Sequence, residues 1–387
     1  MRKDNDASAS GFTYGKAGVD IQHTDALKSE MSEYVSTGHP RVLNKMGQFA
    51  SLFDFKFDDI AHPVLVLKSE EPGSKQKLAM EYGYAESICH DMINHLVNDI
   101  IVMGAAPLAV LDTIVCGSAD KETIKSIVKG ISDACRNNEC VLVGGETSIQ
   151  PGIVDAGTYI LTSSIAGVVD KENIIDGSLI KDGDVVLAVA SNGLHTNGYT
   201  LVRLMMSEMP QIMDDIIEGE TFIESIMRPH TAYYGALKDL ITGVGPTSGL
   251  DSASSLDSTS GLSSTAGLSS VSSPDSSFVH VLKGMAHITG GGIEGNLSRI
   301  IPDSLCAKID LAKVRTLPIF KYIKNTGNIS DSEMLSTFNC GVGLMLVVAP
   351  ENAGVVAEHI QRYFDCYPVG EVRTGSSKVC FENSMAW

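Results

Sequence analysis

The sequence predicts an α/β (α+β) protein of two domains, and three observations lead to this fold class. The chain has 387 residues, more than one typical domain, and 43 % of them are hydrophobic, which is enough for two buried cores. Short apolar runs of strand length alternate with segments of helical periodicity. The turn-rich segment Asp176–Asp184 separates two such series. We therefore expect one domain at 1–170 and a second at 171–387.

The first series of elements occupies residues 63–168. Its apolar runs and helical periodicity predict, in order, a strand at 63–68, a helix at about 85–103, a strand at 108–111, a helix at about 121–135 and a strand at 141–143. Strands that alternate with helices in this way are typical of α/β domains.

The second series follows the turn-rich segment and is interrupted once. Its pattern predicts a strand at 185–189, a helix from about Gly198, a helix at 231–240, ordered structure again at 279–282, a strand at 344–348, a helix at about 352–363 and a strand near 368–372. The interruption at 244–277 is rich in serine and lacks Lys, Arg and Glu. Because such a segment buries too little apolar surface to offset its ordering entropy, we expect a flexible surface loop. Whether its serines are phosphorylated stays open.

Composition excludes several classes of function. The formal charge of −18 and pI near 4.9 argue against a nucleic-acid-binding surface, which needs clustered Lys and Arg. The N-terminus is polar, and no apolar run reaches the ~20 residues of a membrane span. The eight cysteines never form a CxxC pair, which favours reduced thiols over a zinc or disulfide framework. We expect a cytoplasmic protein that binds neither nucleic acid nor membrane.

Four segments place glycine beside polar residues next to apolar runs. They are Leu142–Thr147, Ser191–Tyr199, His287–Gly292 and Ser336–Gly343. Because glycine has no Cβ, the backbone at such points can approach a polar ligand closely. The four segments are therefore the candidate binding edges of the protein.

The glycine pattern itself permits two interpretations. Gly290–Gly295 formally satisfies GxGxxG, but a dinucleotide-binding fingerprint needs a strand–turn–helix unit around it, and here the serine-rich segment precedes it closely. A helix that starts after three glycines still presents unpaired N–H groups that suit a phosphate. The sequence contains no GxxxxGK[ST] phosphate loop, so any use of ATP requires another architecture.

Carboxylates occur at two places where a ligand site is plausible. Asp91 and Asp99 are eight residues apart, and so lie on nearly the same face of the predicted helix. They favour a Mg²⁺ or polar-ligand edge about as well as a solvated helix face. Glu146 follows two glycines at the end of a strand, where ligands of α/β sheets gather.

His195 and Cys340 each have a structural and a chemical interpretation. His195 precedes Thr196 and Asn197, which are favoured N-cap residues for the following helix, but His195 itself suits phosphate contact or proton transfer. Cys340 has no neighbouring base or cation that would lower its pKa, so we expect it to serve packing.

Taken together, in their order and spacing, the four glycine segments resemble those of the phosphoribosylformylglycinamidine cyclo-ligases, also called aminoimidazole ribonucleotide synthetases. Tyr14–Ile21 and Asn98–Leu108 extend the match. The resemblance implies a protomer whose N-terminal sheets join across a homodimer into a barrel. It also implies an enzyme of purine biosynthesis that uses ATP and Mg²⁺ to close formylglycinamidine ribonucleotide to aminoimidazole ribonucleotide through an iminophosphate.

The resemblance further implies roles for individual residues. The residues implied in catalysis are Asp99, Glu146 and His195. Those implied in nucleotide binding are Glu70, Ser74, Lys75 and Asp91, and those implied in binding Mg²⁺ are Glu70, Asp99 and Glu146. Those implied in binding the ribonucleotide are Asn197, Gly198, His287, Thr289, Gly290, Gly291, Gly292, Asn339 and Gly341. Whether His195 or His287 transfers a proton stays open.

Two segments depart from the family pattern. The family's nucleotide loop commonly reads Thr-Asp-Gly-Val-Gly-Thr-Lys, whereas this chain has Ser69–Lys75 with two glutamates and a proline, which removes a backbone N–H. The turn Arg228–Thr231 lacks the arginine that commonly follows Pro-Thr. Two other interpretations therefore stay open: a diverged ATP-dependent ligase or kinase for another metabolite, and a non-catalytic dimeric homologue.

Overall fold

The computed structural model describes residues 31, 33–35, 38–44, 48–118, 120–242 and 281–387, and these form two compact units. Of the described residues, the N-terminal unit groups those up to 56 with those of 69–96 and 108–166. The C-terminal unit groups 57–68 and 97–107 with the described residues of 167–387. The domain boundary near 170 stays a prediction, and both the serine-rich segment at 244–277 and Tyr14–Ile21 lie outside the described residues.

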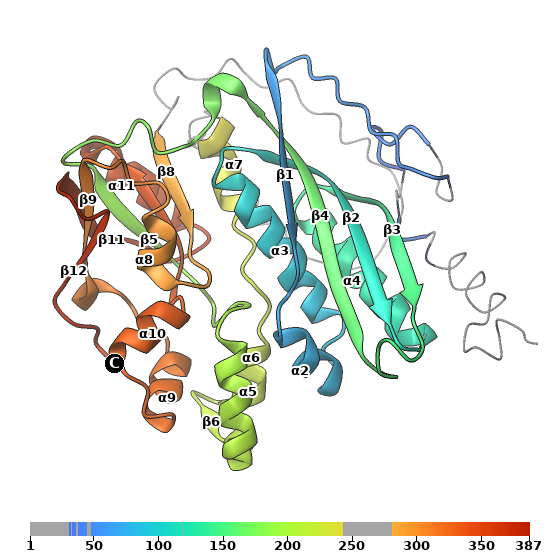
Figure 1. The fold of residues 1–387 in the computed structure, drawn as a ribbon. Helices are drawn as coiled ribbons and strands as arrows, with labels where there is room; N and C mark the ends of the chain where they lie inside the picture. The colour runs from blue at the N-terminus through green and yellow to red at the C-terminus, as the bar shows by residue number, and fades with distance from the viewer. Residues whose placement is uncertain (1–30, 32, 36–37, 45–47, 119, 243–280) are drawn as a thin grey trace, which may run out of the picture. The chain divides into compact units, whose positions relative to one another are not determined.

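A four-stranded sheet has the strand order β1-β4-β2-β3 (Figure 1). Its strands are β1 (Pro63–Glu70), β2 (Ala106–Cys116), β3 (Val141–Ile149) and β4 (Tyr159–Asp170). β2 and β3 run parallel, with Asp112 opposite Gly145. β1, β2 and β4 contribute residues to both units, as does helix α3 (Ser87–Ile101).

Helix α4 (Lys121–Asn137) packs on strand β3 within the N-terminal unit. Its apolar residues recur at helical spacing, so one face is buried, including Ile124, Ile127 and Ile131. Asp120 caps the helix, because its carboxylate accepts a hydrogen bond from the N–H of Thr123 at 2.8 Å. The short helix α2 (Lys75–Glu81) belongs to the same unit.

The C-terminal unit contains a six-stranded sheet of order β12-β9-β11-β5-β10-β8. Its strands are β5 (Val185–Ala190), β8 (Leu282–His287), β9 (Leu305–Asp310), β10 (Val342–Val348), β11 (Cys366–Thr374) and β12 (Val379–Glu382). Every residue of β10 is buried, because the strand lies between β5 and β8 and carries apolar side chains on both faces. This strand is the centre of the unit's core.

Helices complete the C-terminal unit around this sheet (Figure 1). They are α5 (Tyr199–Glu208), α6 (Phe222–Met227), α7 (Tyr234–Thr242), α8 (Gly292–Leu297), α9 (Pro318–Thr326), α10 (Asp331–Thr337) and α11 (Pro350–Ile360). α11 packs against β5, β11 and α7, whereas α8 packs against β8 and α10. The hairpin of β6 (Ile216–Ile217) and β7 (Glu220–Thr221) precedes α6.

The predicted elements that fall on described residues are present, but several limits differ. The strands expected at 108–111 and 141–143 extend to 116 and 149. The apolar pattern missed their later residues because these alternate in burial or are exposed. The helix expected from Thr231 begins at Tyr234, and residues 231–233 belong to no helix or strand. The sequence did not specify β4, β9 and β12.

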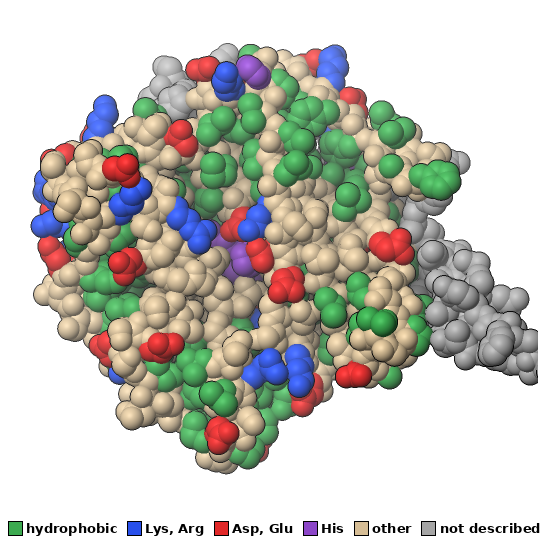
Figure 2. Space-filling model, viewed as in Figure 1, with side chains coloured by type: hydrophobic (Ala, Val, Ile, Leu, Met, Phe, Trp, Pro, Cys, Tyr) green, Lys and Arg blue, Asp and Glu red, His purple; other side chains and the backbone are tan. Residues whose placement is uncertain are grey.

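Charge and hydropathy of the folded chain agree with its composition. Acidic and basic side chains are interspersed over the face shown in Figure 2. All eight cysteines carry free thiols. Among the described residues, no helix combines the length and the apolar character that crossing a membrane requires.

Candidate active site

Three of the four glycine segments meet at one edge of the six-stranded sheet. β10 is antiparallel to both β5 and β8, and Leu344 lies opposite Val189 on one side and His287 on the other. The ends of β5 and β8 and the start of β10 therefore lie at the same edge. The segments that leave or enter the strands there are 191–199, 287–292 and 336–343. We call this region the glycine edge.

Asn339 holds two of these segments together. Its amide nitrogen donates to the carbonyl of Gly193 at 2.9 Å, and its amide oxygen accepts from the N–H of Gly341 at 2.9 Å and from Ser191 Oγ at 3.0 Å. Asn339 is fully buried. Gly341 has φ of 102°, and a Cβ there would lie 2.6 Å from the carbonyl oxygen of Arg315, so only glycine fits. Asn339 thus stabilises the shape of the glycine edge from inside.

Three buried histidines lie side by side at the glycine edge. The rings of His195 and His230 stack with centroids 3.8 Å apart and planes 24° apart. Nε2 of His230 lies 2.9 Å from Nε2 of His287, and Nε2 of His195 lies 3.2 Å from Thr231 Oγ1. His230 therefore contacts both of the histidines that the sequence analysis singled out.

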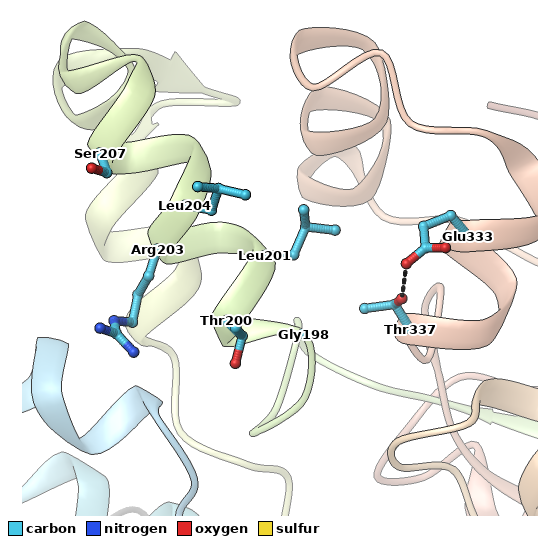
Figure 3. A pocket seen from close by; sticks show the side chains of 8 residues that line it. All are labelled: Gly198, Thr200, Leu201, Arg203, Leu204, Ser207, Glu333 and Thr337. Carbon is cyan, nitrogen blue, oxygen red and sulfur yellow. Dashed lines mark hydrogen bonds between the residues drawn. The ribbon is translucent and has the colours of Figure 1, made fainter.

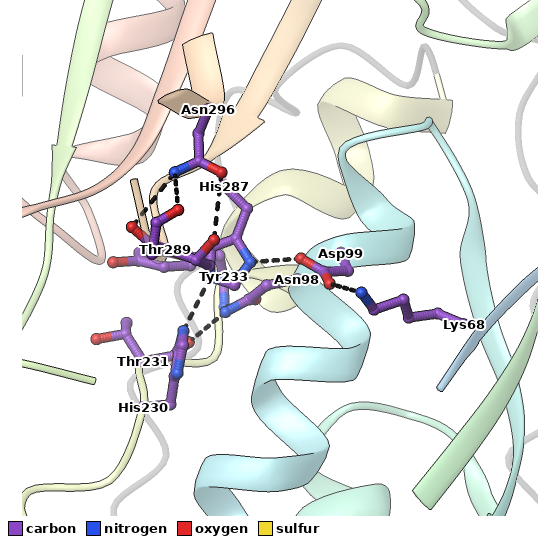
Figure 4. A network of polar contacts seen from close by, with 10 residues as sticks. Lys68, Asn98, Asp99, His230, Thr231, Tyr233, His287, Thr289 and Asn296 are labelled. Carbon is purple, nitrogen blue, oxygen red and sulfur yellow. Dashed lines mark hydrogen bonds and ion pairs between the residues drawn. The ribbon is translucent and has the colours of Figure 1, made fainter. Parts of the chain in front are cut away.

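Asp99 and Asn98, near the end of α3, connect to these histidines within the C-terminal unit (Figure 4). Asp99 Oδ1 lies 2.7 Å from His287 Nδ1, and its Oδ2 lies 2.9 Å from Lys68 Nζ. Asn98 Nδ2 donates to the carbonyl of Thr231 at 2.8 Å. A continuous polar array therefore runs from Lys68 through Asp99 and His287 to His230.

These three histidines offer ligand atoms within 4.8 Å of one another, a spacing compatible with a metal. Stacked imidazole rings, however, direct their in-plane lone pairs side by side rather than toward one point. The rings of His195 and His230 are stacked, and Nε2 of His230 lies within hydrogen-bonding distance of Nε2 of His287. The arrangement suits ring-to-ring hydrogen bonding better than metal coordination.

The triple-glycine loop is held by Asn296 of α8. Its amide nitrogen lies within hydrogen-bonding distance of three carbonyl oxygens, those of Thr289, Gly290 and Gly292. The N–H of Gly291 donates to the carbonyl of Ser336 at 3.1 Å. α8 has only six residues. The loop thus takes its shape from its own contacts, and its proposed contact with the substrate stays a prediction.

Helix α5 starts at Tyr199 with Gly198 as its N-cap residue, so the expectation that Thr196 or Asn197 caps it was wrong. Gly198 has φ of 79°, and a Cβ there would lie 2.1 Å from a ring carbon of Phe338. Close packing of this aromatic ring requires glycine and excludes the polar cap. Asn197 and Gly198 both lie on the glycine edge.

A groove of about 680 Å³ lies between α5 and α10 beside this helix start (Figure 3). Its lining residues are Gly198, Thr200, Leu201, Arg203, Leu204, Ser207, Glu333 and Thr337. Leu201 and Leu204 give it apolar area, whereas Arg203 and Glu333 supply opposite charges. The groove joins residues of two of the three segments at the glycine edge.

Lys75 and Asp91 form a fully buried ion pair in the N-terminal unit. Lys75 Nζ lies 2.8 Å from Asp91 Oδ2, and both side chains have no exposed area. Burial lowers the pKa of Lys75, and the neighbouring Asp91 opposes that change. Asp91 and Asp99, which the helical spacing placed on one face, therefore have different partners in this structure.

The other residues implied in nucleotide binding lie around the start of α2. Ser74 is the N-cap residue of that helix. Glu70 ends β1, and its carboxylate accepts from the N–H of Glu71 at 3.4 Å. Both glutamates belong to the segment that departs from the family pattern.

Asp112 is a carboxyl that the sequence analysis did not single out. Burial raises its pKa to about 7, and nearby Glu146 adds to the increase. Gly145 lies opposite on β3, where a Cβ would lie 1.8 Å from Asp112 Oδ1. An acidic residue inside the apolar run 108–116 was the available signal. His230 and Lys68 likewise lie in no segment that the sequence pattern marked as a candidate site.

Cys340 is buried, and burial, with Asp331 contributing, raises the pKa of its thiol to about 12. The thiol is therefore protonated near neutral pH, which supports the expected packing role.

Comparison with known proteins identifies two matching family models. Residues 64–169 match the model described as "AIR synthase related protein, N-terminal domain", and residues 239–381 match "AIR synthase related protein, C-terminal domain". Together the two models cover most of the chain.

Curated relatives match along most of their length. The phosphoribosylformylglycinamidine cyclo-ligase of Geobacillus kaustophilus is 36 % identical over 368 residues, which cover 94 % of this chain and 96 % of the relative. That of Methylobacillus flagellatus is 35 % identical over 342 residues, 88 % of each chain.

Solved structures share the fold at low identity. The hydrogenase maturation protein HypE in complex with ATP aligns with a TM-score of 0.60 at 14 % identity, over 95 % of this chain and 92 % of that one. Thiamine-monophosphate kinase from Stenotrophomonas maltophilia aligns with a TM-score of 0.58 at 13 % identity, over 93 % and 97 %.

Proposed function

This chain belongs to the phosphoribosylformylglycinamidine cyclo-ligase family, and from this membership we propose that it closes the imidazole ring of purine biosynthesis. Its substrates are ATP and formylglycinamidine ribonucleotide, and its products are aminoimidazole ribonucleotide, ADP and phosphate. It is an enzyme that forms a C–N bond.

The reaction needs activation because an amide oxygen is a poor leaving group. ATP phosphorylates the formyl amide oxygen to give an iminophosphate, and ADP departs. The amidine nitrogen then attacks the activated carbon, loses a proton and closes the five-membered ring as phosphate leaves. The protein contributes positioning and neutralisation of charge.

The observation that supports the location of this chemistry is the meeting of three segments at the glycine edge. We place the ribonucleotide there, beside His195 and His287 and along the groove with Arg203. Phosphate recognition by an arginine guanidinium is favourable because its donors match phosphate oxygens. Asn339 is proposed to act here through the shape of the segment, since its amide already binds Gly193, Gly341 and Ser191.

The N-terminal unit supplies the residues proposed for ATP. These are Glu70, Ser74, Lys75 and Asp91. In this structure Lys75 bonds to Asp91 in a site without solvent, so contact between its ammonium and a phosphate requires that pair to rearrange. ATP that binds without displacing the pair would instead use the backbone N–H groups near the start of α2.

Magnesium would neutralise part of the triphosphate charge, and Glu70, Asp99 and Glu146 are the carboxylates proposed to hold it. Glu146 is exposed and lies near Asp112, so two hard oxygen donors adjoin one another on β2 and β3. Asp99 already pairs with Lys68 and His287. The structure therefore supports Glu146 better than Asp99 as a ligand.

A homodimer is proposed to form through the four-stranded sheet. Large apolar side chains are exposed at alternate positions of β1, where Leu65 is 49 % and Leu67 is 69 % exposed. Leu111 on β2 and Ile160 on β4 are also exposed. Exposed apolar surface of this kind is typical of an interface.

A cytoplasmic location is also proposed, which the eight free thiols support.

The deciding experiment measures ADP and aminoimidazole ribonucleotide in the same reactions, with Mg-ATP and with or without formylglycinamidine ribonucleotide. Equal amounts of substrate-dependent ADP and imidazole product are expected. ADP or nucleotide binding without imidazole product would contradict the proposed substrate and point to another metabolite. Absence of nucleotide binding would contradict the enzyme altogether.

A further inference from the structure

The polar array at the glycine edge fixes where its protons lie. Asp99 forms an ion pair with Lys68, so its carboxylate accepts hydrogen bonds and cannot donate one. His287 must therefore donate from Nδ1 to Asp99, across 2.7 Å. A neutral imidazole has one donor and one acceptor nitrogen, which makes Nε2 of neutral His287 an acceptor.

This assignment determines the tautomer of His230. Its Nε2 lies 2.9 Å from Nε2 of His287, and one of the two nitrogens must carry a hydrogen. Since Nε2 of His287 accepts, Nε2 of His230 donates. With both histidines neutral, the two hydrogen bonds run in one direction: His230 donates to His287, and His287 donates to Asp99.

His230 is itself held on more than one side. Asn192 Nδ2 donates to the carbonyl of the preceding Pro229 at 2.9 Å, and Asn98 Nδ2 donates to that of the following Thr231 at 2.8 Å. The ring stacks on His195, and only 1 % of His230 is exposed. The segment is therefore anchored on both sides of His230 and presents one imidazole to both neighbouring histidines.

We propose that His230 is a positioning residue of the ring-closing reaction, which holds the ring orientation of His287 by a hydrogen bond to its Nε2 and supports His195 by stacking. It acts through these two residues and does not itself touch the substrate. Asp99, paired with Lys68, fixes the tautomer of His287 from the other side of the ring. The inference rests on the proposed function for its effect on rate, but the tautomer assignment stands independently of it.

Three variants separate the hydrogen bond from the bulk of the side chain. His230→Gln places an amide donor near the position of Nε2, whereas His230→Met fills similar space without a donor. His359→Gln is the matched control, because His359 is also buried in the C-terminal unit and bonds through Nε2, to the carbonyl of Ala236 at 3.1 Å.

The expected kinetic result is a fall of roughly tenfold to a hundredfold in kcat for His230→Met, with KM for ATP changed less than about twofold. His230→Gln should retain most of the activity, and His359→Gln should match the original protein. Equal activity of the Met and Gln variants would overturn the proposal. If the Met variant does not fold, His230→Asn replaces it, because the shorter amide does not reach the position of Nε2.

¹⁵N NMR of the histidine rings supplies a readout that does not require activity. In the unaltered protein and in His230→Gln, His287 should be protonated at Nδ1 and unprotonated at Nε2. In His230→Met the proton should stay on Nδ1, because Asp99 still accepts it, but the Nε2 resonance should shift toward that of a nitrogen without a hydrogen bond. A proton on Nε2 of neutral His287 in the unaltered protein would refute the assignment. If the unaltered protein makes no imidazole product, the proposed function fails while the NMR result still decides the role of His230.

Discussion

At the scale of single residues, Asp112 gives the clearest dependence on pH. The pKa of its carboxyl is raised from 3.8 to about 7, and burial is the largest cause. Between these values the folded protein keeps a proton that the unfolded chain has lost, so the free energy of unfolding falls as the pH rises from about 4 to about 7. Below the unfolded value this effect is absent. At pH 8 it reaches on the order of 4 kcal/mol, at ~1.4 kcal/mol for each pKa unit.

Asp112→Asn should therefore stabilise the protein more at high pH than at low pH, because asparagine does not ionise. Relative to the unaltered protein, the gain should be about 2–3 kcal/mol larger at pH 8 than at pH 5. Urea unfolding at both values, with a chelator present to remove divalent ions, measures it. A difference that does not change with pH would show that Asp112 is ionised in the folded state.

Gly343 and Gly354 form a matched pair of glycines with opposite expectations. A Cβ at Gly343 would lie 1.8 Å from Tyr233 Oη, which donates to the carbonyl of Ala190. Gly343→Ala should therefore destabilise the protein by about 1–3 kcal/mol. In α11, a Cβ at Gly354 would meet no described atom within 4 Å, and Gly354→Ala should stabilise by about 0.5–1 kcal/mol. Thermal unfolding distinguishes the two, and changes of equal sign would contradict the packing at the glycine edge.

At the scale of secondary-structure elements, the N-terminus of α4 depends on one side chain. Asp120 accepts from both the N–H and the hydroxyl of Thr123, and these bonds lower the pKa of Asp120. Asp120→Ala should cost about 1 kcal/mol of stability, whereas Asp120→Asn, which keeps a cap, should cost less. Chemical denaturation measures the free energy of unfolding of the two variants. Equal losses in Asp120→Ala and Asp120→Asn would show that the hydrogen bonds that asparagine retains do not stabilise the helix.

Elements differed in how clearly the sequence marked them. β10 was recognisable because all its residues are apolar and buried. β2 and β4 alternate in burial over part of their length, so polar residues interrupt the apolar runs. α8 and α10 have six and seven residues, too few to display helical periodicity. Length and two-sided burial therefore decided which elements the pattern revealed.

At the scale of the whole molecule, the exposed apolar residues of β1 predict an oligomer. Leu67→Lys should convert the proposed dimer to monomers, because a charge placed in an apolar interface is costly to bury. Val355→Lys is the control, since Val355 is 43 % exposed on α11. Sedimentation measures both masses. A dimeric Leu67→Lys variant or a monomeric unaltered protein would contradict the proposed interface.

The sequence by itself determined the family, the reaction and the principal strands and helices, because motifs and periodicity are local properties of the chain. Only the tertiary structure decided that β5, β8 and β10 pair so that three glycine segments share one edge. It also decided that Lys75 bonds to Asp91 and that His230 bonds to His287. His230 and His287 are 57 residues apart, and a local pattern does not encode which strands pair or in which register. Long-range pairing therefore assembled the candidate site.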